Sequence, residues 1–296
     1  MGNLGIDIGG TFIKYVYKDE EGEKKGKEYV RDVIQRNDLN GFLEKVLEII
    51  KKFNPEKVGI AVAGLVDKKE GVITESPNLK ILNNFPLKSK LENLINIPVF
   101  IENDANLAAL GEWRYGAGRG KNISICLTLG TGLGGGAVLN GQLLSGVSGS
   151  AMEIGHITIV KDGRQCHCGR HGCLEAYVSS YGLERIYFLK TDKYKDSGEI
   201  ILEANEGKED AMESLEEFSE YLAVGLMNIT HIFNPDVIIL SGGIIENYPL
   251  IKDMSLSYLK HLAFNLPFRD LELKVAELGE FSGAYGSLEL TQQNTI

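Results

Sequence analysis

Two segments of the chain repeat one order of hydrophobic and polar positions. Residues 40–53 carry apolar side chains at helical spacing, an Asn-Pro pair ends the pattern, and residues 57–63 form an apolar run. Residues 212–233 predict a longer amphipathic helix, a second Asn-Pro pair follows it, and residues 236–240, an aspartate and four apolar residues, predict a strand. Each segment therefore predicts a helix, a stop and a buried strand.

A pair of strands joined by glycines and threonine precedes each of these units. Residues 4–17 predict an antiparallel hairpin with Gly9-Gly10 at its turn. Residues 123–129 predict a strand that leads into the glycine-rich stretch 130–136 and then a second strand at 137–140. Because the same elements come twice in the same order, we predict a duplicated α/β domain.

Composition limits the classes of protein that fit this pattern. The chain has 296 residues, 43% hydrophobic and 24% charged, which suits two globular domains. Its net charge is 31 − 41 = −10, which disfavours a surface that binds nucleic acid. No apolar run reaches membrane-spanning length and the N-terminus does not match a signal peptide, so we expect a cytoplasmic protein with no membrane partner.

The second half contains a cluster of metal-binding residue types. One imidazole and three thiols follow at the spacing H-x9-C-x-C-x4-C, contributed by His156, Cys166, Cys168 and Cys173. This set is typical of a closed tetrahedral zinc site. The alternatives are disulfides and unrelated core cysteines. The crowding of the cysteines and the lack of a secretion signal disfavour disulfides. His167 and His171 rank below His156 as ligands, and Cys126, in an apolar run, is predicted to be a small buried side chain.

Two acids flank this cluster. Glu153 stands just before His156, and Glu175 stands just after Cys173. A zinc ion bound here would fix two carboxylates and one imidazole edge relative to each other. The hydroxyl groups of a polyol require that kind of rigid placement, so this segment is a candidate sugar site.

The first glycine turn carries groups suited to phosphate. The turn amides and the Thr11 hydroxyl predict contacts with ATP oxygens, and Asp7 predicts an indirect contact with Mg²⁺. An ordinary tight hairpin is the alternative. Lys14 has two equal interpretations, a phosphate contact or a solvated side chain.

The motif E-x-G-H followed by C-x-C-G-x-x-G-C-x-E, at residues 153–175, resembles the signature of the ROK family of bacterial sugar kinases and sugar-responsive repressors. Within that family, the cluster followed by Ala176-Tyr177 is most similar to the glucokinases. The stretch Glu102-Asn-Asp-Ala-Asn106 is similar to the sequence that ROK kinases carry at their catalytic aspartate. Taken alone, Asn103 or Asp104 also suits a helix N-cap.

The resemblance implies the duplicated actin-like ATPase (ribonuclease H-like) α/β fold, with ATP in a cleft between two domains. We expect residues 1–117 to form a small domain, which the C-terminal helix 281–296 joins. Residues 118–280 would form a larger domain with the zinc insertion at 153–175. A homodimer or higher homo-oligomer is also implied.

The roles of individual residues follow from the same resemblance. Asp104 is the expected catalytic base. The sugar ligands would be Gly64, Asn78, Asn103, Asp104, Glu153, His156 and Glu175. The residues for ATP and its phosphates would be Asp7, Gly9, Gly10, Thr11, Lys14, Thr131, Gly132, Gly242 and Gly243. The cofactors would be ATP, Mg²⁺ and structural Zn²⁺.

The reaction that this set implies is ATP-dependent phosphorylation of a hexose at its 6-hydroxyl, with glucose first. N-acetylmannosamine and N-acetylglucosamine are alternative sugars. A sugar-responsive repressor without catalysis is the rival of another class, and an actin-like ATPase that acts on proteins is a third. The family usually has glycine before the first acid of the motif, whereas this chain has Met152, which leaves the sugar open.

Overall fold

The computed structural model describes residues 1–68, 70–76 and 78–293, and the chain forms two compact units. The first unit contains Met1–Gly120, Leu143–Ala151 and the residues from Glu280 onward. The second contains Lys121–Gln142 and Met152–Gly279. The predicted domain bounds stay a prediction, and these units differ from them chiefly at residues 143–151.

The first unit is built on a five-stranded sheet of order β3-β2-β1-β4-β7. Its first three strands are antiparallel, and β1, β4 and β7 are parallel. The bounds of these strands are β1 (Asn3–Ile8), β2 (Phe12–Asp19), β3 (Gly22–Tyr29), β4 (Lys57–Val62) and β7 (Val99–Asn103). A separate two-stranded sheet is formed by β5 (Leu65–Asp67) and β6 (Val72–Glu75).

The helices of the first unit are α1 (Arg31–Gln35), α2 (Leu39–Phe53), α3 (Leu87–Ile95), α4 (Asp104–Tyr115) and α12 (Ser282–Gln293). The predicted helix at residues 40–53 is confirmed as α2. It begins where the Asp38 side chain accepts the Gly41 N–H, and it ends at Asn54 in the left-handed conformation. Its apolar face, with Phe42 and Val46 fully buried, packs into the core that the sheet forms.

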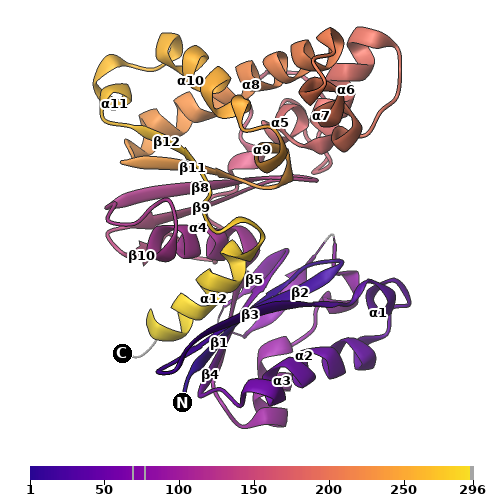
Figure 1. Cartoon of the computed structure of the whole chain (residues 1–296), viewed down its shortest axis with the longest axis vertical. Helices are drawn as coiled ribbons and strands as arrows, with labels where there is room; N and C mark the ends of the chain where they lie inside the picture. Colours follow the sequence, from indigo (N-terminus) through magenta and orange to yellow (C-terminus); the bar gives the residue numbers. More distant parts are fainter. Residues whose placement is uncertain (69, 77, 294–296) are drawn as a thin grey trace. The chain divides into compact units, whose positions relative to one another are not determined.

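The C-terminal helix α12 packs on β1, β4 and α4 (Figure 1). Glycines permit this close approach: a Cβ on Gly59 would lie 1.9 Å from the Ser287 carbonyl oxygen, and one on Gly286 would lie 1.7 Å from that of Leu107. The Ser287 hydroxyl donates to the Ile6 carbonyl at 2.8 Å. The last helix thus packs on elements of the first unit, and the predicted bounds of the domain that it joins stay a prediction.

The second unit repeats the plan with a sheet of order β10-β9-β8-β11-β12. Its strands are β8 (Ile123–Leu129), β9 (Leu133–Leu139), β10 (Gln142–Leu143), β11 (Val237–Ser241) and β12 (Glu272–Val275). Its longer helices include α8, which lies beside α10 (Figure 1). The helical elements are η2 (Ile154–His156), α5 (Glu175–Val178), α6 (Ser180–Thr191), α7 (Ser197–Asn205), α8 (Glu209–Phe233), α9 (Gly243–Asn247), α10 (Leu250–Leu262) and α11 (Asn265–Arg269).

Both sheets place an antiparallel hairpin beside two parallel strands, so the predicted duplication is confirmed. One boundary was wrong. The second hairpin turns at residues 130–132, and Gly134, Gly135 and Gly136 lie inside β9, paired with β8. Glycine is required there for packing, because a Cβ on Gly135 would lie 2.8 Å from the Met152 carbonyl oxygen.

Within the part of the chain that the structure describes, no helix is both long and apolar enough to span a membrane.

Candidate active site

Asp104 stands at the point where β7 ends and α4 begins. The Asn103 side chain caps this helix by accepting the N–H groups of Ala105 and Asn106 at 2.9 and 3.1 Å. It also donates to the Gly64 carbonyl at 3.0 Å, which joins the ends of β7 and β4. The N-cap interpretation is thus correct for Asn103, and the cap holds Asp104 in the first turn of the helix.

A second acid lies near Asp104 in the first unit. Asp7 stands on β1 directly opposite Lys14 on β2, and the Lys14 ammonium lies 3.8 Å from the Asp7 carboxylate. The structure therefore places Lys14 beside an acid, whereas the sequence had suggested a phosphate contact or a solvated side chain. A contact between Lys14 and phosphate stays a prediction.

Burial dominates the electrostatics of both acids. Burial raises the pKa of Asp7 to about 6, against a smaller opposing effect of Lys14 and a supporting one of Asp104. Burial also raises the pKa of Asp104, although backbone N–H groups and Lys14 oppose the shift. A carboxylate with a raised pKa is a stronger base than an exposed one, which suits Asp104 to accept a proton.

The first glycine turn lies at the ends of these strands. The Gly9 N–H donates to the Phe12 carbonyl at 3.0 Å and closes the hairpin. A Cβ on Gly10 would lie 4.0 Å from the Asn78 carbonyl oxygen, so the predicted phosphate turn and Asn78 are neighbours. Thr11 follows at the start of the second strand of the hairpin, where its carbonyl accepts the Val30 N–H.

The four predicted zinc ligands come together in the second unit, with all four ligand atoms within 4.8 Å of one another. The Cys168 and Cys173 sulfurs lie 3.7 Å apart, and Cys166 Sγ lies 3.8 Å from His156 Nδ1. Tetrahedral Zn–S bonds of about 2.3 Å require edges of about 3.8 Å, so the set fits the ion. All three cysteines are free, which agrees with the rejection of disulfides.

The acids that flank this cluster have different surroundings. Glu153 Oε2 lies 4.0 Å from His156 Nε2, the ring nitrogen that does not contact Cys166. One histidine edge thus contacts the thiol cluster and the other lies toward an acid. Met152, directly before Glu153, is 7% exposed and holds the left-handed conformation at φ 69°.

Glu175 uses both carboxylate oxygens in contacts within the protein. Its Oε2 accepts the Leu133 N–H at 2.9 Å, and its Oε1 accepts the Tyr181 hydroxyl at 3.3 Å. Burial raises the pKa of Tyr181, so this hydroxyl stays a donor. Cys166 Sγ also lies 3.5 Å from Glu175 Oε1, so Glu175 links the thiol cluster to the second glycine turn, a connection that sequence reasoning missed. The ring of His167 stacks on Tyr181 instead of joining the cluster.

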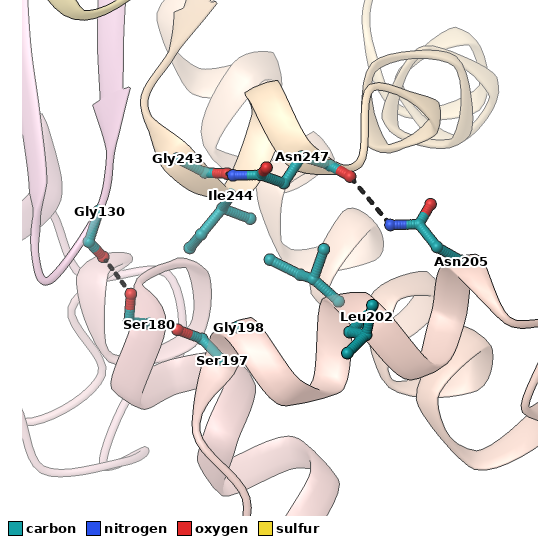
Figure 2. Close-up of a pocket in the computed structure, with 10 residues that line it drawn as sticks. Gly130, Ser180, Ser197, Gly198, Leu202, Asn205, Gly243, Ile244 and Asn247 are labelled. Carbon is teal, nitrogen blue, oxygen red and sulfur yellow. Dashed lines mark hydrogen bonds between the residues drawn. The ribbon is translucent and has the colours of Figure 1, made fainter.

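A cavity of about 440 Å³ lies beside that turn (Figure 2). It is lined by Gly130, Ser180, Ser197, Gly198, Ile201, Leu202, Asn205, Gly243, Ile244 and Asn247. Ser180 Oγ donates to the Gly130 carbonyl, and Asn205 Nδ2 donates to the Asn247 carbonyl. The volume is that of a small-molecule site.

The cavity joins two stretches that the sequence had assigned to ATP. The turn that contains Thr131 and Gly132 begins at Gly130, and α9 begins at Gly243. Gly242 holds φ 103°, and a Cβ there would lie 2.3 Å from the Leu129 carbonyl oxygen, so this position requires glycine. The polar lining residues Ser180, Ser197, Asn205 and Asn247 carried no motif and were missed.

Comparisons with known proteins decide the family. A model of the ROK family matches residues 3–294. This chain belongs to the ROK family. Its fold is accordingly the actin-like ATPase fold, as the sequence had predicted.

Individual relatives agree with this assignment. The chain is 31% identical to a glucokinase of Streptomyces coelicolor over 309 residues, which covers 98% of this chain and 97% of that protein. It is similar to the crystal structure of a ROK family glucokinase from Streptomyces griseus in complex with glucose and AMPPNP. That match has a TM-score of 0.84 and 32% identity, and covers 99% of this chain and 100% of that chain. A xylose repressor of Bacillus spizizenii is also 32% identical, over 96% of this chain and 75% of the repressor. The predicted family and enzyme class, a sugar kinase, are confirmed.

Proposed function

We propose that this ROK family member transfers the γ-phosphoryl group of ATP to the 6-hydroxyl of a hexose, with glucose as the first substrate to test. The observation that carries the proposal is the buried acid at the start of α4: Asp104 combines a fixed backbone position with a raised pKa. The family supplies the reaction class, and the similarity to glucokinases supports glucose.

In the proposed reaction, Asp104 accepts the proton of the attacking 6-hydroxyl. A bond forms between O6 and the γ-phosphorus, the bond from that phosphorus to the β,γ-bridging oxygen breaks, and ADP leaves. Phosphoryl transfer asks the protein mainly for positioning and charge stabilisation. Asn78, Asn103, Glu153, His156 and Glu175 are the proposed contacts for the ring hydroxyls, with Gly64 beside them.

The second unit supplies the proposed nucleotide site. Gly130 and Gly243 line one cavity, so the adjoining Thr131-Gly132 and Gly242-Gly243 backbones are the proposed neighbours of ATP. In the first unit, Gly9, Gly10 and Thr11 are the proposed phosphate contacts. Mg²⁺ would neutralise the charge of the phosphates. The Asp7 carboxylate is the kind of oxygen ligand that binds this ion.

Zinc has a structural part in the proposal. His156, Cys166, Cys168 and Cys173 fit a closed tetrahedral site, which leaves no position for a reacting water. The ion would stabilise the segment between Glu153 and Glu175 and fix the orientation of the His156 ring.

A sugar-responsive regulator is the competing function, because xylose repressors match the same residues. A coupled assay of ADP release over a panel of glucose, mannose, N-acetylglucosamine, N-acetylmannosamine and xylose separates the two. We expect glucose to give the highest kcat/KM. Preference for an N-acetyl sugar would replace glucose within the proposal. Sugar binding, measured calorimetrically, without ADP release would reject the proposal and favour the regulator, and sugar-independent ATP turnover would reject both.

A further inference from the structure

The acid that precedes Asn103 is buried and ion-paired. Glu102, near the end of β7, has a side chain that is 2% exposed. Its Oε1 accepts the Asn103 N–H at 2.9 Å and the Asn106 side-chain amide at 3.1 Å. These two contacts hold the Asn103 backbone and the Asn106 side chain, on either side of Asp104 in the sequence. An ionised carboxylate in such a position requires a cationic partner.

Lys68 is that partner. Its ammonium pairs with Glu102 Oε2, on the oxygen opposite the one that holds Asn103 and Asn106. Lys68 follows β5, and its side chain is 36% exposed, so it is partly open to solvent while its ammonium contacts Glu102.

The same ammonium has a second contact. Lys68 Nζ donates to Ser145 Oγ at 2.5 Å. Ser145 belongs to the loop Leu143–Ala151, which packs with the first unit although the residues before and after it pack with the second. The loop approaches β5 at another point, because a Cβ on Gly149 would lie 3.2 Å from the Val66 carbonyl oxygen and 3.5 Å from Lys68 Cγ.

Each partner of Lys68 is close in the sequence to a residue of the proposed sugar site. Glu102 is two residues from Asp104, the proposed base. The loop ends at Ala151, two residues before Glu153, a proposed sugar ligand. A single ammonium thus joins the strand end that positions the base to the loop that precedes the acid.

We propose that Lys68 is a positioning residue: it ties the loop Leu143–Ala151 to the end of β7, and so coordinates sugar binding with placement of Asp104. The inference rests on the proposed kinase function for its kinetic consequence but not for the tether itself. Loss of the loop contact raises the KM for the sugar, and loss of the Glu102 pair lowers kcat.

Three variants separate the two contacts by kinetics. Ser145→Ala removes only the loop contact and should raise the sugar KM about tenfold, as expected for a lost charged hydrogen bond, with kcat within about twofold. Lys68→Met removes both contacts and should also lower kcat at least about tenfold. Lys68→Arg keeps a cation and should recover most of both losses. Lys45→Met, which removes a surface pair with Glu48 on α2, is the control and should leave kcat and KM unchanged.

Hydrogen exchange tests the tether without turnover. In the full chain with neither sugar nor nucleotide, peptides within residues 143–151 should exchange at least about fivefold faster in Lys68→Met and Ser145→Ala than in wild type, while α2 keeps its protection. If Lys68→Met does not fold, Ser145→Ala and Lys68→Arg carry the test. Unchanged exchange of the loop in Ser145→Ala would overturn the proposal, and so would equal effects of Ser145→Ala on KM and kcat. A wild-type chain that phosphorylates no sugar would reject the proposed function, and loop exchange would still decide the tether.

Discussion

The two sheets share one strand plan but differ in the chemistry at corresponding positions. In the first unit, Asp7 on β1 stands opposite Lys14 on β2. In the second unit, Thr128 on β8 stands opposite Gly134 on β9. Both hairpins close with a backbone hydrogen bond of 3.0 Å, from Gly9 N–H to Phe12 and from Gly130 N–H to Gly132.

The two units therefore differ in the kind of site that each offers. In the first unit, Asp7 on β1 and Asp104 at the start of α4 are buried, and burial raises the pKa of both carboxyls. At the matching positions the second sheet has Thr128 and Gly134, which carry no charge, and the cavity lined by Gly130 and Gly243 lies beside its turn. In the proposed function, one copy of the duplicated fold supplies the acid–base group and the other supplies the nucleotide cavity.

The comparison predicts its largest effect at Asp104. Asp104→Asn should lower kcat by at least about a hundredfold while sugar affinity stays within about tenfold, because a general base acts mainly in the transition state. In wild type, kcat/KM should fall on acidification at a pH above the usual range of an aspartate, since burial raises the pKa of Asp104. Steady-state kinetics and calorimetry measure both. Asp32→Asn on the exposed face of α1 is the control. A kcat near wild type in Asp104→Asn would reject the base.

The second unit should respond through its thiol cluster. Cys168→Ser removes one ligand from an exposed position, so the chain should fold but lose bound zinc and weaken sugar binding by about ten- to a hundredfold. Elemental analysis and calorimetry measure these changes. The matched variant is Cys126→Ala in β8, which lies outside the cluster and should keep its zinc. Wild-type protein purified without zinc would contradict this part of the proposal.

A smaller effect is expected on stability at Asp7. Burial raises its pKa from 3.8 to about 6, so the folded state loses stability as the pH rises through this range and Asp7 ionises. Asparagine does not ionise. The stability of Asp7→Asn relative to wild type should therefore increase by up to about 3 kcal/mol between about pH 4 and about pH 7. Urea titrations at several pH values measure this difference. A difference that does not vary with pH would show that the folded protein tolerates the Asp7 charge without penalty.

The smallest effect concerns Met152. Glycine at this position would remove the free-energy cost of the left-handed backbone, about 1–2 kcal/mol, but it would also remove a side chain that is only 7% exposed. Loss of a buried methionine costs about 2–5 kcal/mol, so Met152→Gly should lower stability by about 1–3 kcal/mol. Thermal unfolding measures this, and the sugar panel shows whether the preferred sugar changes. Increased stability would mean that backbone strain outweighs packing here.

Much of the fold followed from local pattern. The helix at residues 40–53 and the strand at 123–129 were predicted because apolar periodicity and Asn-Pro stops act over short distances. The turn after Leu129 was predicted too long, because glycine is equally suited to a turn and to a tightly packed strand. The contact that requires Gly135 comes from Met152, which sequence pattern does not locate.

The candidate site was predictable where ligand spacing carries the chemistry, as in the cysteine cluster. The pairs Asp7–Lys14 and Glu102–Lys68 were missed, because each depends on the register or proximity of separate strands. Glu175 was expected to contact sugar alone, and its hydrogen bond to the Leu133 N–H depends on tertiary structure.

The position of α12 has a consequence for synthesis of the chain. Ser282–Gln293 is translated long after strands β1 and β4, yet it covers both of them. During synthesis, one face of the first sheet therefore stays uncovered until α12 has emerged from the ribosome. Most of the second unit, in contrast, is one continuous segment that can fold as it is made. Nascent chains arrested before residue 282 should therefore recruit chaperones. Removal of α12, although the helix is short, should strongly reduce the yield of folded protein.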